Sequence, residues 1–166
     1  MILSAFYEHR LKELYSEYIT VLKGLASDDL EFYRKFALNA LQGCLEKKPE
    51  QEELILEILV NKLGDTSKKV QCHTIYLLLK LSQAHIEMTE VVVHSVSLFI
   101  SRSKEQSHIF YSVAYLNRIA QMVAPKDDKV RLMLLRIYFS LFRKVLKNDE
   151  ESKAEIIVKK DRSKSK

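Results

Sequence analysis

The fold is decided by Leu63-Gly64-Asp65-Thr66-Ser67-Lys68-Lys69-Val70-Gln71, a short polar break between two helix-sized apolar stretches. Gly64 can end the first helix in the left-handed conformation that only glycine adopts at little cost. Asp65 or Thr66 can accept hydrogen bonds from the free N–H groups of the next helix. A single apolar face then follows at spacings of three and four residues, formed by Val70, Thr74, Leu77 and Leu78. The sequence predicts two antiparallel helices joined by a tight turn, which is the unit of an α-solenoid.

The same helical period extends in both directions from this turn. Apolar residues recur at helical spacing over seven segments, at about 3–23, 28–48, 49–63, 68–84, 91–100, 106–123 and 127–146. Asp28 with Glu31 three residues later is a capping box for the second segment, in which Phe36 is expected to face the core. Pro49 suits the first turn of the third segment. Val91-Val92-Val93 would also suit a strand, but its segment is longer than a typical strand and lies among helices, so it is predicted to be a helix.

The segments also repeat along the chain. A shift of 37 residues pairs Asp28, Tyr33, Ala37 and Leu41 with Asp65, Val70, Thr74 and Leu78. A shift of 40 pairs Asp65, Val70 and Thr74 with Glu105, Phe110 and Ala114. These periods lie just below the roughly 40–47 residues of HEAT and armadillo repeats and above the roughly 34 of tetratricopeptide repeats. We expect an all-α, HEAT/armadillo-like α-solenoid of about seven helices in three and a half hairpins over residues 1–147, followed by a polar, basic, disordered tail over 148–166.

Composition narrows the class of protein. The 166 residues are 47% apolar, with three glycines and two prolines, too few for a chain made of many β-turns. No uninterrupted apolar span reaches the length of a transmembrane helix, and the N-terminus becomes charged too soon for a secretory signal, so we expect a soluble, intracellular protein. Cys44 and Cys72 are expected to be small buried thiols. Of the net charge of +5, the last eight residues carry +4 and the rest of the chain only +1.

The seventh segment is apolar on almost every side. A helix of this kind must be covered on more than one face, and the preceding hairpin can cover only one. Either further repeats or a partner chain must therefore pack against it. We predict partner contact at Tyr138, Phe139 and Phe142.

The sequence contains no recognisable catalytic arrangement. It has no glycine-rich phosphate loop and no His-Glu-x-x-His pattern, and its five histidines are scattered. Paired carboxylates such as Glu52-Glu53 stand at helix starts, where the helix dipole already favours them. We expect neither an enzyme nor a bound metal, cofactor or small-molecule substrate.

Basic residues make nucleic-acid contact the better candidate. Lys68 and Lys69, with Arg143 and Lys144, are predicted to contact phosphates, which gives affinity without sequence selectivity. The alternative is that they belong to solvated helix faces. In the tail, Lys159, Lys160 and Arg162 suit a nuclear import signal, or else a solubilising end.

Several stretches together resemble the CCAAT-binding-factor family over about residues 5–147. The most distinctive are Val60-Asn61-Lys62-Leu63-Gly64-Asp65 and Ile137-Tyr138-Phe139-Ser140-Leu141-Phe142, and the others are 6–12, 48–52 and 115–117. The pattern departs at His85, which precedes Ile86 where the family has proline, and after Lys153.

The resemblance implies a helical-repeat scaffold of the nucleolus that assembles the large ribosomal subunit. It implies a second nucleolar complex protein and the pre-ribosomal particle, with its ribosomal RNA, as partners, and no membrane. Family members are much longer, which implies that this chain is an early piece of the repeat region. One alternative is a HEAT-type protein-binding adaptor that does not contact RNA. Another is a CCAAT-linked transcription regulator, which is disfavoured because no helix here is basic enough to enter a major groove.

Overall fold

The computed structural model describes the backbone of residues 2–47, 50–122 and 127–164, and the side chains of 6–47, 50–122 and 127–146. Within those ranges the only regular elements are helices. In chain order they are α1 (Ile2–Leu25), α2 (Glu31–Lys47), α3 (Glu52–Asn61), the 3₁₀ helix η1 (Lys62–Gly64), α4 (Lys68–Ala84), α5 (Met88–Arg102), α6 (Gln106–Met122) and α7 (Asp128–Lys164). The helical hairpins predicted from the sequence are therefore present, and Pro49 lies outside the described residues.

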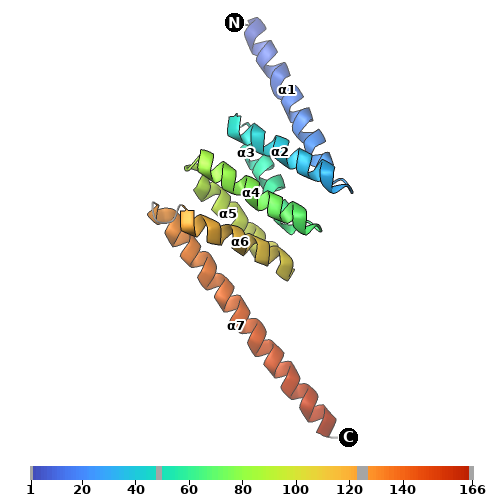
Figure 1. Cartoon of the computed structure of the whole chain (residues 1–166), viewed down its shortest axis with the longest axis vertical. Coiled ribbons are helices and arrows are strands. Elements are labelled where there is room, and N and C mark those ends of the chain that lie inside the picture. Colours follow the sequence, from blue (N-terminus) through green and yellow to red (C-terminus); the bar gives the residue numbers. More distant parts are fainter. Residues whose placement is uncertain (1, 48–49, 123–126, 165–166) are drawn as a thin grey trace.

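The helices stack in two layers. α2, α4 and α6 lie side by side in one layer, and α3, α5 and α7 follow one another in the second (Figure 1). α1 packs mainly on α2 and then diverges from the stack, while α7 extends away from its opposite end (Figure 1). This arrangement is consistent with the predicted α-solenoid.

A continuous apolar core separates the two layers. Fully buried side chains come from every helix of the stack, including Leu41 of α2, Leu59 of α3, Leu78 of α4 and Val93 of α5. The valine-rich segment is helical because Val92, Val93, Val96 and Ile100 fall on one buried face, where packing overrides their preference for strands. No helix within the described residues combines the length and apolarity needed to cross a membrane.

The core also holds a buried polar pair. Tyr115 of α6 is fully buried, and its hydroxyl lies 3.1 Å from Ser82 Oγ of α4. Burial raises the pKa of Tyr115 well above its ordinary value, so the phenol stays neutral at physiological pH. The pair therefore joins α4 to α6 without placing a charge in the core.

Gly64 does not adopt the conformation predicted for it, and a different feature of the structure favours glycine there. It is the last residue of η1 and does not have a positive φ, so it does not adopt the left-handed conformation. A Cβ atom at this position would instead lie 3.0 Å from both His108 Nδ1 and Phe99 Cζ. Glycine suits this position because two side chains of the following hairpin approach the turn closely, and they would have to shift to admit a Cβ.

Several positions expected to be buried are exposed. Phe36 is 56% exposed, because the buried face of α2 is formed instead by its neighbours at positions 34, 37, 38, 41, 42 and 45. Cys72 is exposed on α4, and Cys44 is only partly buried. An apolar residue on a three-or-four spacing can fall at either edge of a helix face, and the neighbouring helix decides which edge is covered.

The predicted capping box does not form, because Leu30 rather than Asp28 holds the N-cap position of α2. Asp28 Oδ1 accepts a hydrogen bond from the Leu30 N–H at 2.8 Å. Glu31 does not complete the box, because its carboxylate accepts a hydrogen bond from the Ser67 hydroxyl of the next hairpin. The side chain that was expected to cap its own helix links two hairpins instead.

The repeat is more regular than the sequence suggested. The shift of 37 pairs buried Ala37 with Thr74 and buried Leu41 with Leu78. The second shift of 40 is wrong, because it places none of the buried positions of α4 on a buried position of α6. Buried positions correspond at a shift of 38 (112 − 74), which matches Thr74, Leu77, Leu78 and Leu81 to Ser112, Tyr115, Leu116 and Ile119.

The last helix is longer than predicted. The α7 backbone continues past Leu146, where the sequence analysis placed its end, to Lys164. The division into a repeat domain (1–147) and a separate tail (148–166) stays a prediction.

Candidate partner-binding surfaces

A buried ion pair fixes the turn that decides the fold. Arg34 of α2 reaches the α3–α4 turn, where its Nη2 lies 3.2 Å from Asp65 Oδ1, and the two side chains are only 10% and 4% exposed. The same guanidinium donates through Nη1 to the backbone carbonyls of Asp28 at 2.8 Å and Asp29 at 2.9 Å. Asp65 also pairs with Lys62 at 3.3 Å and accepts a hydrogen bond from the Ser67 N–H at 2.9 Å. This network sets the spacing of α2 and α4.

The network also orders the side chains along the α2–α4 boundary. Ser67 holds the Glu31 carboxylate, and this hydrogen bond, followed by the charges of Lys69 and Lys35, lowers the pKa of Glu31. Further along both helices, His73 Nε2 of α4 lies 3.0 Å from Asn39 Oδ1 of α2. Side-chain hydrogen bonds between residues of α2 and the α4 hairpin therefore fix the positions of the polar side chains at this boundary.

The predicted partner-binding residues of α7 fall on two different faces. Tyr138 is partly buried, its hydroxyl donates to Asn117 Oδ1 of α6 at 2.7 Å, and burial raises its pKa. Phe139 and Phe142 point outward and are 66% and 60% exposed. Tyr138 therefore helps to hold α7 against α6, whereas the two phenylalanines remain available for contact.

The two phenylalanines belong to a longer apolar stripe, which we call the α7 seam. Its exposed members stand at alternating spacings of three and four residues, at Leu132, Leu135, Phe139, Phe142 and Leu146. The opposite side of α7 is buried at Val130, Leu134 and Ile137, where the helix packs on α5 and α6. The α7 seam was visible in the sequence as an all-round apolar helix, but only the structure separates its inner and outer faces.

The predicted phosphate contacts do not form one patch. Lys68 and Lys69 are exposed in the first turn of α4, whereas Arg143 and Lys144 are exposed on α7. The main contacts of α7 are with α5 and α6, not with α4. Lys159, Lys160 and Arg162 lie within the α7 backbone, but their side chains are outside the described residues.

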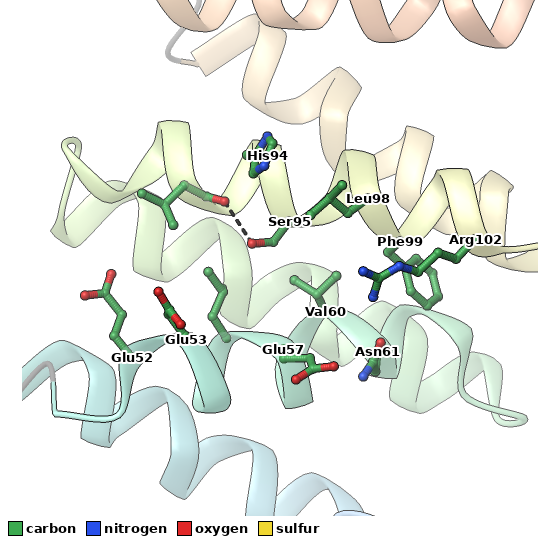
Figure 2. A pocket seen from close by; sticks show the side chains of 12 residues that line it. Glu52, Glu53, Glu57, Val60, Asn61, His94, Ser95, Leu98, Phe99 and Arg102 are labelled. Atoms are coloured by element: carbon green, nitrogen blue, oxygen red, sulfur yellow. Dashed lines mark hydrogen bonds between the residues drawn. The ribbon is translucent and has the colours of Figure 1, made fainter.

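An acidic groove between α3 and α5 was missed by the sequence analysis. It is open, has a volume of about 610 Å³, and has Leu56 and Val60 in its floor. Its α3 side carries Glu52, Glu53 and Glu57, and its α5 side carries His94 and Arg102 (Figure 2). The three glutamates were visible in the sequence, but helix-dipole stabilisation already explained the first two. Among the described side chains, no group of three His, Cys, Asp or Glu residues is placed to hold a metal ion.

Comparison with known proteins identifies the chain's relatives. No protein-family model matches it. "Ribosome biogenesis protein NOC1" of Chaetomium thermophilum is 36% identical over 143 residues, which are 86% of this chain and 14% of that protein. "CCAAT/enhancer-binding protein zeta" of Homo sapiens is 34% identical over 150 residues, 89% of this chain and 14% of that protein. "Nucleolar complex protein 1" of Drosophila melanogaster is 31% identical over 140 residues, 82% of this chain and 12% of that protein.

The matches cover most of this chain but little of each relative. The chain spans 14% of the length of the fungal and human proteins and 12% of the fly protein. Identity at this level over more than four-fifths of the chain is common descent rather than a shared helical composition. The chain belongs to the CCAAT-binding-factor family.

Proposed function

We propose that this chain is a non-catalytic helical-repeat scaffold that acts in biogenesis of the large ribosomal subunit in the nucleolus. Two relatives carry names that refer to ribosome biogenesis and to a nucleolar complex, which supports this process and this compartment. The single structural observation that carries the scaffold role is the α7 seam, because a folded chain leaves five large apolar side chains exposed there.

The partner on the α7 seam is a second nucleolar complex protein. The alternating spacing of the seam matches the way one helix packs against another, so the partner contributes an apolar helical face. Fully burying a Phe side chain contributes roughly 1.5–3 kcal/mol. Phe139 and Phe142, which are the most exposed residues of the α7 seam, are therefore its expected anchors.

The basic residues contact the pre-ribosomal particle. Lys68 and Lys69 on one side of the stack, and Arg143 and Lys144 on α7, are exposed and can reach phosphates of ribosomal RNA. Lys159, Lys160 and Arg162 serve nuclear import. No step in this function requires catalysis, because docking alone holds the partners in place.

The scaffold role is tested by capture of partners from nucleolar extract. The chain carrying both Phe139→Ser and Phe142→Ser is compared with wild type after RNase treatment, so that only protein contacts are scored. Leu30→Ser, at an equally exposed position on the α1–α2 connection, is the control. We expect the double variant to lose the nucleolar partner while the control keeps it. Equal capture by a double variant that retains wild-type circular dichroism would reject the α7 seam as the docking surface.

A transcriptional role is the second candidate, since two relatives are named CCAAT/enhancer-binding protein zeta. It predicts sequence-selective binding of a CCAAT duplex at physiological salt. The scaffold function predicts crosslinking to precursor ribosomal RNA in cells instead, and a HEAT-type adaptor that does not contact RNA predicts neither.

A further inference from the structure

We propose that the outer surface of α2 and α4 binds single-stranded RNA, with exposed aromatic rings stacking on bases and lysines contacting phosphates. We call this surface the aromatic–basic face, and it consists of Lys35, Phe36, Lys69, His73 and Tyr76. The proposal rests on the proposed function, in which RNA of the pre-ribosomal particle is one of the ligands, and it adds the site and the form of RNA that is bound.

The two helices hold these side chains close together. The contact between His73 and Asn39 joins α4 to α2 at 3.0 Å. The His73 ring stacks on Tyr76, with ring centroids 6.2 Å apart and planes inclined by 28°. Lys35 lies near enough to His73 for its charge to add to the effect of burial in lowering the His73 pKa. A ring pair and a cation from two helices therefore meet at one boundary.

Charge distinguishes this layer from the other one. α4 and α6 contain no Asp or Glu, whereas α3 carries three glutamates in ten residues. The two glutamates of α2 are already engaged. Glu31 accepts a hydrogen bond from Ser67, and Glu46 accepts one from Gln42 at 2.8 Å and pairs with Lys80 at 3.1 Å. In the described part of the chain neither Lys35 nor Lys69 forms an ion pair within 4.0 Å. Glu31 keeps its negative charge and lies near enough to both lysines for their charges to lower its pKa, so two lysines against one carboxylate leave the face positively charged toward a polyanion.

The exposed rings favour RNA over a protein ligand. Phe36 and Tyr76 are 56% and 61% exposed, and Phe110 of the adjacent helix α6 is 66% exposed. These rings come from different helices, α2, α4 and α6, whereas the α7 seam is one continuous stripe along a single helix. A protein helix needs a continuous apolar contact, whereas each base of a single strand can stack on one isolated ring while its phosphate lies near a lysine. A duplex keeps its bases stacked inside and cannot use the rings.

Binding can be measured with the purified chain and a fluorescent single-stranded RNA of about 12 nucleotides. Loss of one stacking ring should weaken affinity roughly tenfold, so we expect this from Phe36→Ala and from Tyr76→Ala, while Tyr76→Phe stays within about twofold. Phe6→Ala is the matched control, because it removes an exposed aromatic ring of α1 that is not part of the aromatic–basic face. It should leave the RNA affinity unchanged. The same RNA annealed to its complement should bind at least about tenfold more weakly.

Salt dependence tests the lysines separately. Affinity is measured from about 50 to 200 mM salt, and the slope of log affinity against log salt is negative. Its magnitude should decrease by about 0.7 for each phosphate contact that a substitution removes. Lys69→Gln should show this loss, and Lys12→Gln on α1 should not.

Cys72 provides a footprint of the bound strand. It is exposed on α4, one turn before Tyr76, and replacing the other cysteine by Cys44→Ser leaves it as the single thiol. RNA on the aromatic–basic face should slow alkylation of Cys72 severalfold. Unchanged alkylation at saturating RNA, equal affinity for duplex, or wild-type affinity of Tyr76→Ala would each overturn the proposal. So would tighter binding of an acidic peptide of similar length than of the RNA.

The scaffold function and the RNA site can be rejected independently of each other. Phe139→Ser with Phe142→Ser should lose the nucleolar partner after RNase treatment and keep RNA affinity. If the chain captures the partner but the RNA assays give the overturning results, only the aromatic–basic face is rejected. If RNA binds as described but no partner is captured, the scaffold function fails and the RNA site stands.

Discussion

Arg34 shows how one side chain can set the spacing between two hairpins. Its backbone lies in α2, and its side chain reaches the turn before α4. The guanidinium donates hydrogen bonds to two backbone carbonyls of its own hairpin and forms an ion pair with Asp65 of the next hairpin. Arginine suits this position because its planar group presents several donors in fixed directions, which the single ammonium of lysine cannot do. The buried charge is stable only while all of these acceptors are in place.

Arg34→Met should therefore destabilise the chain strongly. The substitution leaves buried Asp65 with Lys62 as its remaining ionic partner, so we expect a loss of roughly 3 kcal/mol in the free energy of unfolding. Urea denaturation followed by circular dichroism measures it. Arg118→Met, at an exposed position on α6, should change stability by less than about 0.5 kcal/mol. Similar losses from both substitutions would contradict the bridging role of Arg34.

Replacing two of the glycines by alanine should change the free energy of unfolding in opposite directions. Gly64→Ala places a Cβ against His108 and Phe99 and should cost roughly 1–3 kcal/mol. Gly43→Ala, in the interior of α2 with nothing within 4 Å of its Cβ, should stabilise the chain by about 0.5–1 kcal/mol. Melting temperatures of the two variants should move in opposite directions, and a rise in both would refute the close approach at Gly64.

Individual residues were the hardest features to predict. The sequence identified Gly64 and Asp65 as decisive, but their partners Phe99, His108 and Arg34 are distant in the chain. Local spacing placed Phe36 in the core, where the structure leaves it exposed. Spacing along one helix reports which residues share a face, whereas the identity of the covered face depends on the neighbouring helix.

At the scale of elements, α7 combines two apolar faces with different roles. Val130, Leu134 and Ile137 are buried against the stack, while the α7 seam on the other side is exposed. Both faces follow the alternating spacing of three and four, so the sequence alone could not distinguish them. That such a helix needs cover on more than one side stays a prediction.

Neighbouring leucines on α7 should therefore respond differently to truncation. Leu134→Ala removes a side chain that is almost fully buried and should cost roughly 2–5 kcal/mol. Leu135→Ala, in the α7 seam, should cost less than about 1 kcal/mol. Chemical denaturation of the two variants compares them directly. Comparable destabilisation by both would mean that the α7 seam is already covered.

Element boundaries were predicted well where polar breaks mark them. The limits of α4 were predicted within a residue because the Gly64–Ser67 turn is polar and short. The second repeat shift was wrong because it aligned residue types, Phe110 with Val70, rather than buried positions. The end of α7 was placed too early because charged residues after Leu146 resemble a tail and still have good helix propensity.

For the whole molecule, side chains on the α2–α4 boundary make stability depend on pH. Burial and then Lys35 lower the pKa of His73, so the unfolded chain takes up a proton first as the pH falls. Hydrogen bonds from Ser67 and Gln42 are the largest causes of the lowered pKa values of Glu31 and Glu46. Both kinds of pKa shift lower the free energy of unfolding as the pH falls, because in each case the unfolded state binds more protons than the folded state.

We expect the urea midpoint to be constant at neutral pH and to fall as the pH drops below the ordinary histidine pKa of 6.5. It should fall again below the ordinary carboxyl value of 4.5, as Glu31 and Glu46 are protonated through their lowered folded pKa values. His73→Gln should remove the first decrease and keep the second. A midpoint that rose on acidification would contradict these shifts.

The layers of the stack have one more consequence. Each main contact in the described part of the chain joins helices of the same hairpin or of adjacent hairpins. Among the described residues, no main contact connects the first hairpin to the third, so small changes in tilt at each junction can add up along the stack. Pulled at its two ends, such a chain would stretch like a spring before any single helix unwound, and it could follow the curvature of a partner that changes shape.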